Sequence, residues 1–154
     1  MKAITYEQAL HRLAAFCSRG EKCIYDIRQN MKRWELPVNE QEKIIHYLQK
    51  EKFLDEKRFC RAFVNDKIKY NQWGIHKIKY ELKRKQIDDR IIREVLQTID
   101  WKESEKQLHL LLTNKLKTIK AKNDYEMKQK LIRFAVGRGF ALEEIECICQ
   151  QLNI

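Results

Sequence analysis

The sequence predicts an all-α fold made of three tandem three-helix units, each of about 50 residues, in an elongated, curved array. Lys, Glu, Gln, Leu, Arg and Ala, which favour helices, dominate the chain, and apolar residues recur at spacings of three and four. Only 4 Gly and 1 Pro occur among the 154 residues, whereas a β-sandwich or β-barrel needs frequent turn residues. The composition therefore disfavours an all-β fold and indicates helices nearly throughout.

Start and stop signals divide the chain into helices expected at about residues 4–16, 20–33, 39–52, 55–70, 74–85, 88–100, 101–121, 124–137 and 141–152. Two segments have the spacing of a capping box, Thr5-x-x-Gln8 and Ser18-x-x-Glu21. Single residues that can cap a following helix are Asn39, Asp55, Asp88 and Asp124.

The apolar pattern of the middle of the chain recurs on both sides. When Ile75, Ile78, Leu82, Ile87, Ile92, Val95 and Ile99 are shifted by 53 residues, 6 of the 7 positions are again apolar. Shifted back by 51 residues, the first four match Ile24, Ile27, Met31 and Leu36. The register then slips by three residues, which we place at Pro37-Val38-Asn39. We interpret the pattern as a degenerate repeat with units at residues 1–53, 54–100 and 101–154. The alternative is a chance match between amphipathic helices.

The formal net charge of the chain is +10, which favours a polyanionic partner such as nucleic acid, or less often an anionic membrane surface. The alternative is a soluble basic protein that has no such partner. The segment 55–86 holds 10 basic and 4 acidic residues, so it supplies over half of the excess. A second basic run, at residues 115–138, is diluted by Asp124 and Glu126. This concentration indicates a phosphate-binding surface on the middle unit.

Candidate contact residues lie on the two helices expected at 55–70 and 74–85. The helical period places Phe59, Phe63 and Tyr70 on an apolar face of the first helix, with basic residues on another face. We expect Lys67 nearer the core. The residues that we select for contact with a partner are Arg58, Arg61, Lys69, Lys77, Lys79, Lys83 and Arg84. We expect Trp73 and Gly74 to shape this surface, Gly74 because its φ or close packing disfavours a side chain. The alternative is that these basic residues form ordinary solvated faces.

Nothing in the sequence indicates a catalytic, metal or cofactor site. The 4 His are far apart, the 5 Cys lack zinc-ligand spacing, and no nucleophile–base set or phosphate-binding glycine loop is present. The odd number of cysteines and the absence of an export signal predict a reducing cytoplasm, with the thiols in core or incidental positions. The longest apolar run has five residues, too few to span a bilayer. We therefore expect a cytoplasmic, monomeric protein that is not an enzyme and has no membrane partner.

Three segments resemble the RecX family of recombination regulators. Leu54-Asp-Glu-Lys-Arg-Phe-Cys-Arg-Ala-Phe63 is similar to the family's start of the middle unit. Ile78-Lys-Tyr-Glu-Leu-Lys-Arg-Lys-Gln-Ile87 and Lys130-Leu-Ile-Arg-Phe-Ala-Val-Gly-Arg-Gly-Phe140 are similar to patterns of the middle and last units. Cys60 replaces a common Ala, a conservative packing change. Gln86 stands where the family usually has Gly, so this turn is either extended helix or a turn of different geometry.

The resemblance implies an all-helical protein that binds the filament of the RecA recombinase on single-stranded DNA. Such a protein lies in the filament groove and suppresses the ATPase, strand-exchange and coprotease activities of RecA. Its contacts with single- and double-stranded DNA are expected to be weaker and electrostatic. The alternative is a stand-alone helical DNA-binding module that acts without RecA.

Overall fold

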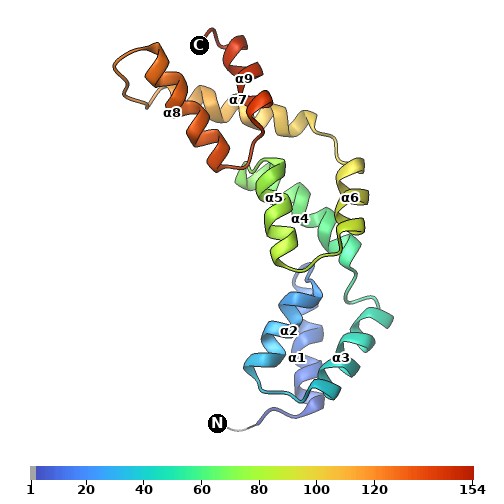
Figure 1. The fold of residues 1–154 in the computed structure, drawn as a ribbon. Helices are drawn as coiled ribbons and strands as arrows, with labels where there is room; N and C mark the ends of the chain where they lie inside the picture. Colours follow the sequence, from blue (N-terminus) through green and yellow to red (C-terminus); the bar gives the residue numbers. More distant parts are fainter. Residues whose placement is uncertain (1–2) are drawn as a thin grey trace. The chain divides into compact units, whose positions relative to one another are not determined.

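The computed structural model describes residues 3–154, and within this range all regular secondary structure is α-helical (Figure 1). The helices are α1 (Tyr6–Ser18), α2 (Ile24–Arg33), α3 (Val38–Lys50), α4 (Glu56–Asn71), α5 (Ile75–Arg84), α6 (Asp89–Thr98), α7 (Lys102–Leu116), α8 (Asp124–Gly137) and α9 (Leu142–Gln151). Each predicted helix has one counterpart, so the predicted all-α class is confirmed.

Three of the predicted N-terminal caps are present. Thr5 and Gln8 form a reciprocal capping box at the start of α1, with N···O distances of 3.0 and 3.1 Å. Asp55 accepts a hydrogen bond of 3.0 Å from the backbone N–H of Arg58, and Asp88 accepts one of 2.7 Å from that of Arg90. These side chains satisfy N–H groups that have no partner inside the first helical turn.

The other predicted caps are wrong. Ser18 lies in the last turn of α1, where its hydroxyl donates to the carbonyl of Ala15. Asn39 lies inside the first turn of α3, because that helix begins directly after Pro37. The cap of α8 is Asn123 in place of Asp124, and its side chain accepts from the N–H of Glu126 at 2.8 Å.

The described residues form two compact units. The first comprises residues up to Ala62 together with Leu82–Val95, and the second comprises Phe63–Glu81 and Leu96–Ile154. Helices α4, α5 and α6 therefore contribute residues to both units.

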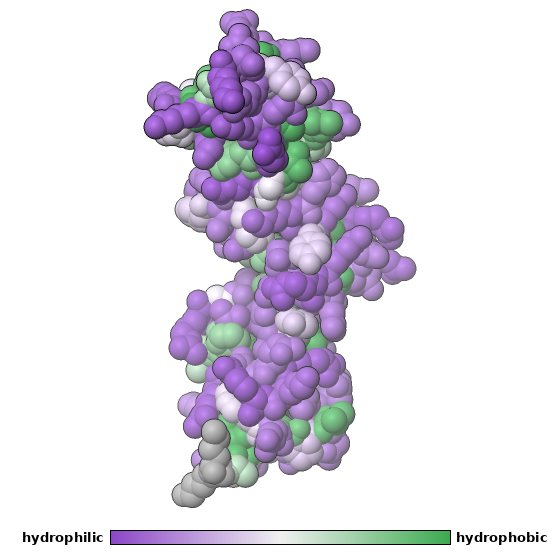
Figure 2. Space-filling model, turned by 60° about the vertical axis from the view of Figure 1, so that its left-hand side comes forward, coloured by the Kyte–Doolittle hydropathy of each residue, from purple (hydrophilic) through white to green (hydrophobic). Residues whose placement is uncertain are grey.

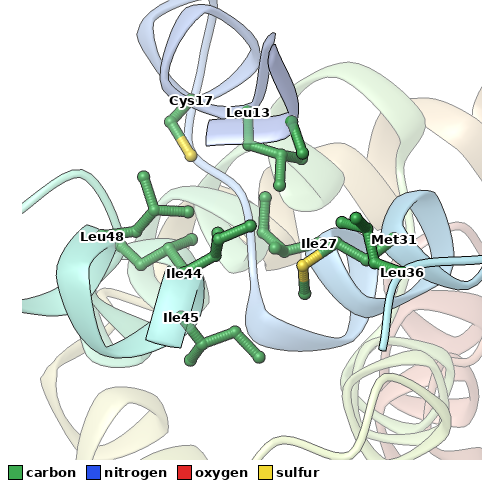
Figure 3. Packing of buried hydrophobic residues seen from close by; sticks show 10 residues of the cluster. Leu13, Cys17, Ile27, Met31, Leu36, Ile44, Ile45 and Leu48 are labelled. Atoms are coloured by element: carbon green, nitrogen blue, oxygen red, sulfur yellow. The ribbon is translucent and has the colours of Figure 1, made fainter. Parts of the chain in front are cut away.

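The core of the first unit is built by α1, α2 and α3 (Figure 3). Leu13 and Cys17 of α1 point toward Ile27 of α2 and toward Ile44 and Leu48 of α3. The buried residues of this core are Ala9, Leu13, Cys17, Ile27, Met31, Leu36, Ile44, Ile45, Leu48 and Leu54. Partly buried aromatic rings, including those of Phe16 and Trp34, pack against its edge. Burial of these apolar side chains is the main force that holds three short helices together.

In the second unit, α7, α8 and α9 pack on one another around an apolar core. Its buried residues are Leu108, Leu112, Leu131, Ala135, Phe140, Ile145, Ile148 and Cys149.

The face of the molecule drawn in Figure 2 is mainly hydrophilic, and hydrophobic residues appear there as small separate areas. Among residues 3–154, every helix is too short or too polar to cross a membrane.

The sequence repeat has a structural counterpart at the ends of α2, α5 and α8. The residues with left-handed φ there are Glu35 (55°), Gln86 (60°) and Gly139 (94°). The next residues, which are buried and donate back to the preceding helix, are Leu36, Ile87 and Phe140. This is a Schellman ending, and its buried residues are separated by the 51 and 53 residues of the sequence repeat. Gln86 therefore keeps a turn geometry that suits glycine.

Two further predictions from the sequence are wrong. Tyr70 is 68% exposed, because the buried face of α4 is centred on Cys60, Val64 and Ile68, which are four residues apart. The three extra residues of the first unit do not lengthen the turn at Pro37. They lengthen the helix, since α3 has 13 residues and α6 has 10.

Candidate functional site

In the second unit, two lysine ammonium groups lie beside the indole ring of Trp73. Trp73 lies between α4 and α5, is partly buried, and packs edge-on against Phe63 with ring centroids 6.3 Å apart. The ammonium groups of Lys67 and Lys77 lie 4.8 and 4.6 Å from the centroid of the indole. Cations at this distance are attracted by the negative face of the ring. Two lysines from different helices are thereby held beside one aromatic side chain.

Lys67 is the residue of this cluster that the sequence analysis discounted. Its ammonium lies 5.3 Å from the ring centroid of Phe63 as well as over Trp73. The spacing of four residues between Phe63 and Lys67 on one helix could have indicated the contact between these two side chains. The contact between Lys67 and Trp73 depends on how the chain turns after α4, which helical periodicity does not show.

Gly74 forms a close backbone contact that we call the glycine contact, made by Gly74, His76, Arg138 and Gly139. The N–H of Gly74 donates to the carbonyl of Arg138 at 2.8 Å, and the N–H of His76 donates to the carbonyl of Gly139 at 2.9 Å. A Cβ on Gly74 would lie 2.4 Å from the carbonyl carbon of Gly139, and a Cβ on Gly139 would lie 2.4 Å from the Cβ of Lys77. Close packing is thus the reason for glycine at position 74.

Arg138 adds a further positive charge to the second unit. Its guanidinium donates to the carbonyl of Asn71 at 3.1 Å and lies 5.4 Å from the ring centroid of Phe134. The ammonium of Lys115 lies 4.7 Å from the same ring. Beside this ring is an open hollow of about 580 Å³. It is lined by Lys115, Thr118, Ile119, Lys120, Lys130, Arg133 and Phe134.

The predicted contact residues divide between the two units. In the second unit Lys69 is exposed, with its ammonium 5.3 Å from the Tyr70 centroid, and Lys77 and Lys79 are partly exposed. In the first unit Arg61, Lys83 and Arg84 are exposed. Each unit therefore presents a basic group of its own.

Arg58 has partners inside the first unit. Its guanidinium donates to the carboxylate of Glu21 at 2.6 Å and to the carbonyl of Lys52 at 2.9 Å. These bonds join the segment before α2 and the end of α3 to the start of α4. We therefore assign Arg58 to the packing of the first unit and leave it out of the contact surface.

Arg58 belongs to a set that we call the ionic contact, made by Glu21, Asp26, Glu56, Arg58 and Lys85. The ammonium of Lys85 donates to the carboxylate of Asp26 at 2.8 Å, and these two side chains are only 18% and 23% exposed. The carboxylate of Glu56 accepts from the N–H of Ile24 at 3.2 Å, at the start of α2. Side-chain charges thus hold α2 against the residues of α4 and Lys85.

Burial acts on the two central carboxylates with different results. Burial alone raises the pKa of Asp26, but hydrogen bonds from Lys85 and Cys23 outweigh it, so that the pKa is lowered. Burial raises the pKa of Glu56, which has the single backbone N–H of Ile24 as compensation. Within residues 3–154 the second carboxylate oxygen of Glu56 is buried with no hydrogen-bond partner, and so is that of Glu21.

Four of the five cysteines are buried and behave as core residues. Burial raises the pKa of Cys23 to about 12 and that of Cys60 to about 11, and it also raises those of Cys17 and Cys149. Such thiols stay protonated and unreactive. Cys147 is exposed. Residues 3–154 bring together no group of three or more His, Cys, Asp or Glu side chains that could hold a metal ion.

Comparison with known families identifies the chain. A family model described as "RecX, second three-helix domain" matches residues 55–96, and one described as "RecX, third three-helix domain" matches residues 103–148. The chain belongs to the RecX family. The resemblance stated from the sequence is thereby confirmed. The first match includes Trp73, the two lysines beside its ring and Gly74. The second match includes Arg138 and Gly139.

The RecX relatives include proteins that are longer than this chain. The "Regulatory protein RecX" of Clostridium botulinum (strain Eklund 17B / Type B) is 35% identical over 112 residues, which cover 71% of this chain and 51% of the relative. That of Clostridium acetobutylicum is 28% identical over 153 residues, covering 96% and 70%. The chain spans about half the length of the first of these RecX proteins.

Solved RecX structures share the fold. A structure described as "Crystal structure of regulatory protein RecX" superposes with a TM-score of 0.85 at 19% identity, covering 94% of this chain and 73% of that one. The "Crystal structure of RecX from Lactobacillus salivarius" gives 0.80 at 17% identity, covering 96% of both chains.

Proposed function

We propose that this chain binds the RecA filament on single-stranded DNA and lowers the ATPase, strand-exchange and coprotease activities of the recombinase. It acts as a monomer composed of three-helix domains at residues 1–53, 54–100 and 101–154. It has no catalytic role of its own. Membership of the RecX family, whose relatives carry the name "Regulatory protein RecX", is the observation that carries this proposal.

We propose that each unit contacts the filament through its own basic group. The group of the first unit is Arg61, Lys83 and Arg84, and that of the second unit is Lys67, Lys69, Lys77 and Lys79. A RecA–DNA filament presents DNA phosphates, and lysine and arginine bind phosphates through charge and hydrogen bonds. Trp73 supports this role because its ring attracts the ammonium groups of both Lys67 and Lys77. Direct DNA contacts are weaker and electrostatic in this proposal.

Titration of the chain into RecA that hydrolyses ATP on single-stranded DNA tests the proposal. We expect inhibition at well below one molecule per recombinase, with a component that persists as salt is raised. Affinity for phosphates alone falls steeply with salt, whereas protein contacts are less affected. Binding of the chain to the same DNA without RecA is measured in parallel.

Two other outcomes would contradict this proposal. Absence of inhibition, together with strong and salt-dependent DNA binding, would contradict RecA regulation and favour a stand-alone DNA-binding module. Inhibition only at amounts that saturate the DNA would show that the chain masks the strand and does not act on the filament.

A further inference from the structure

The first unit contains a hollow that the proposed function does not use. It has a volume of about 630 Å³ and lies between α1 and the end of α2. Its lining residues are His11, Arg12, Leu13, Ala15, Phe16, Ser18, Arg19, Asn30 and Trp34. Leu13 is fully buried, whereas Phe16 and Trp34 are partly exposed and pack their inner sides on the core of the first unit. The hollow is therefore a depression with an apolar floor, large enough for one or two side chains.

The rim of this hollow is positively charged. Arg12 and Arg19 are exposed, and the lining contains no Asp or Glu. The guanidinium of Arg12 lies 5.8 Å from the ring centroid of Trp34, and that of Arg19 lies 5.9 Å from that of Phe16. Lys22 places its ammonium 4.5 Å from Phe16 as well. Neither arginine forms an ion pair with a carboxylate in the described part of the chain, so their charge is available to an outside anion.

A ligand that complements this site has negative charge around an apolar group. Nucleic acid is one such ligand, but a strand carries a charge on every phosphate and binds best where basic residues are concentrated. Residues 1–53 are instead close to balanced, with 10 basic and 7 acidic residues, unlike the strongly basic segment 55–86. A carboxylate can pair with a guanidinium from outside while an apolar side chain enters the hollow. These observations favour a peptide over a DNA strand.

We propose that the hollow between α1 and α2 binds an acidic peptide segment of a partner protein, with one aromatic or aliphatic side chain seated on Phe16 and Trp34 and flanking carboxylates paired with Arg12 and Arg19. This inference does not rest on the proposed function, since it requires neither RecA nor DNA. It gives the first unit a protein-binding role that is separate from the basic surface.

The test uses the full chain and a fluorescein-labelled synthetic peptide, Glu-Glu-Asp-Phe-Asp-Glu-Glu. We expect saturable binding below about 1 mM by fluorescence anisotropy. Replacing the central Phe of the peptide by Ala should weaken binding about tenfold, because the apolar group no longer fills the hollow. In NMR spectra of the chain, the indole N–H signal of Trp34 should shift on titration, while those of Trp73 and Trp101 stay in place.

A matched pair of charge variants locates the site. The double variant Arg12→Gln/Arg19→Gln should weaken peptide binding at least tenfold. Lys43→Gln/Lys50→Gln removes the same charge from exposed positions of α3 and should change binding less than twofold. Circular dichroism confirms that both variants fold, which is expected because all four side chains are exposed.

Several results would overturn the proposal. One is absence of saturable peptide binding, and another is equal weakening by both double variants, which would indicate general attraction between opposite charges. Equal affinity for the Phe and Ala peptides would show that the apolar side chain of the peptide does not bind in the hollow. Displacement of the peptide by a 20-nucleotide oligothymidylate, together with a Trp34 shift caused by the oligonucleotide alone, would assign the hollow to nucleic acid.

Discussion

The ionic contact and the glycine contact fix the starts of two equivalent helices in different ways. At the start of α2, the N–H of Ile24 is accepted by the side chain of Glu56, and neighbouring charges are paired. At the start of α5, the N–H groups of Gly74 and His76 are accepted by backbone carbonyls of the turn between α8 and α9. Cys23 and Gly74, which are equivalent in the repeat, are both buried. The same fold can therefore satisfy a helix start with charges or with close backbone packing.

This difference determines what each contact tolerates. The ionic contact depends on protonation and on pairs of side chains, so pH and charge variants should affect it. The hydrogen bonds of the glycine contact join backbone groups, which do not titrate, but the contact leaves no space for a Cβ. Substitutions of these two kinds therefore separate the contacts.

The largest expected effect is that of Gly74→Ala. The added Cβ would lie 2.4 Å from backbone atoms of Gly139 and Phe140, so α5 must move and its two hydrogen bonds to the α8–α9 turn weaken. We expect a loss of about 3 kcal/mol in the free energy of unfolding, measured by urea denaturation. Gly137→Ala is the matched control, because nothing lies within 4 Å of a Cβ there, and it should stabilise α8 by about 0.5 kcal/mol. Equal effects of the two substitutions would contradict close packing at Gly74.

A smaller effect is expected from the Asp26–Lys85 pair of the ionic contact. A double-mutant cycle with Asp26→Asn and Lys85→Gln should give a coupling energy of about 1 to 2 kcal/mol, because both groups are largely buried. The same cycle on the exposed pair Arg28 and Glu42 serves as the control and should give no measurable coupling. Coupling that is as weak for the buried pair as for the exposed one would show that charge does not hold α2.

The end of α5 gives an effect of about 1 kcal/mol in the opposite direction. Gln86 adopts a left-handed φ of 60°, which costs a residue with a Cβ more than it costs glycine. We expect Gln86→Gly to raise the free energy of unfolding by about 1 kcal/mol in the same urea assay. Gln97→Gly, at an exposed position inside α6, is the control and should destabilise the chain. A loss of stability in Gln86→Gly would contradict the left-handed turn.

The smallest effect concerns the pH dependence of the ionic contact. Because burial raises the pKa of Glu56 above 4.5, the folded chain takes up this proton first as pH falls, so Glu56 contributes stability that is lost as pH rises through its folded pKa. Asp26 has a lowered pKa and acts in the opposite sense, with stability lost only as pH falls below 3.8. Glu56→Gln should therefore be more stable than the wild type at pH 7, by less than about 1 kcal/mol, and equal to it near pH 4.

Thermal unfolding of both proteins from pH 4 to pH 8 measures this difference. Subtracting the stability of the wild type from that of Glu56→Gln removes the contribution of Glu144, which both proteins share and whose pKa is also raised by burial. A constant difference across this range would show that Glu56 is not the group that titrates.

Much of the fold could be predicted from the sequence, because helix content and burial follow local periodicity. The repeat predicted equivalence of Leu36, Ile87 and Phe140, and all three are buried at the same kind of turn. Gly74 was expected to sit where close packing or φ excludes a side chain, and close packing is the reason.

The site was less predictable, because its contacts join residues far apart in the chain. Arg58 was selected as a contact residue, yet it is held by Glu21, 37 residues away. The pairing of Lys85 with Asp26 spans 59 residues. Lys67 was discounted because one helix was considered alone, whereas its position over Trp73 depends on the chain beyond α4. Periodicity within a helix does not contain such information.

The central claim is that the basic groups of the two units direct this RecX-family chain to the RecA filament. The most direct test is the concentration that half-inhibits ATP hydrolysis by RecA on single-stranded DNA, compared between Arg61→Glu/Lys83→Glu and the control Lys43→Glu/Lys50→Glu. All four side chains are exposed. We expect the first variant to need at least tenfold more protein, since reversed charges repel phosphates, and the control to change less than threefold. Equal inhibition by both variants would contradict the claim.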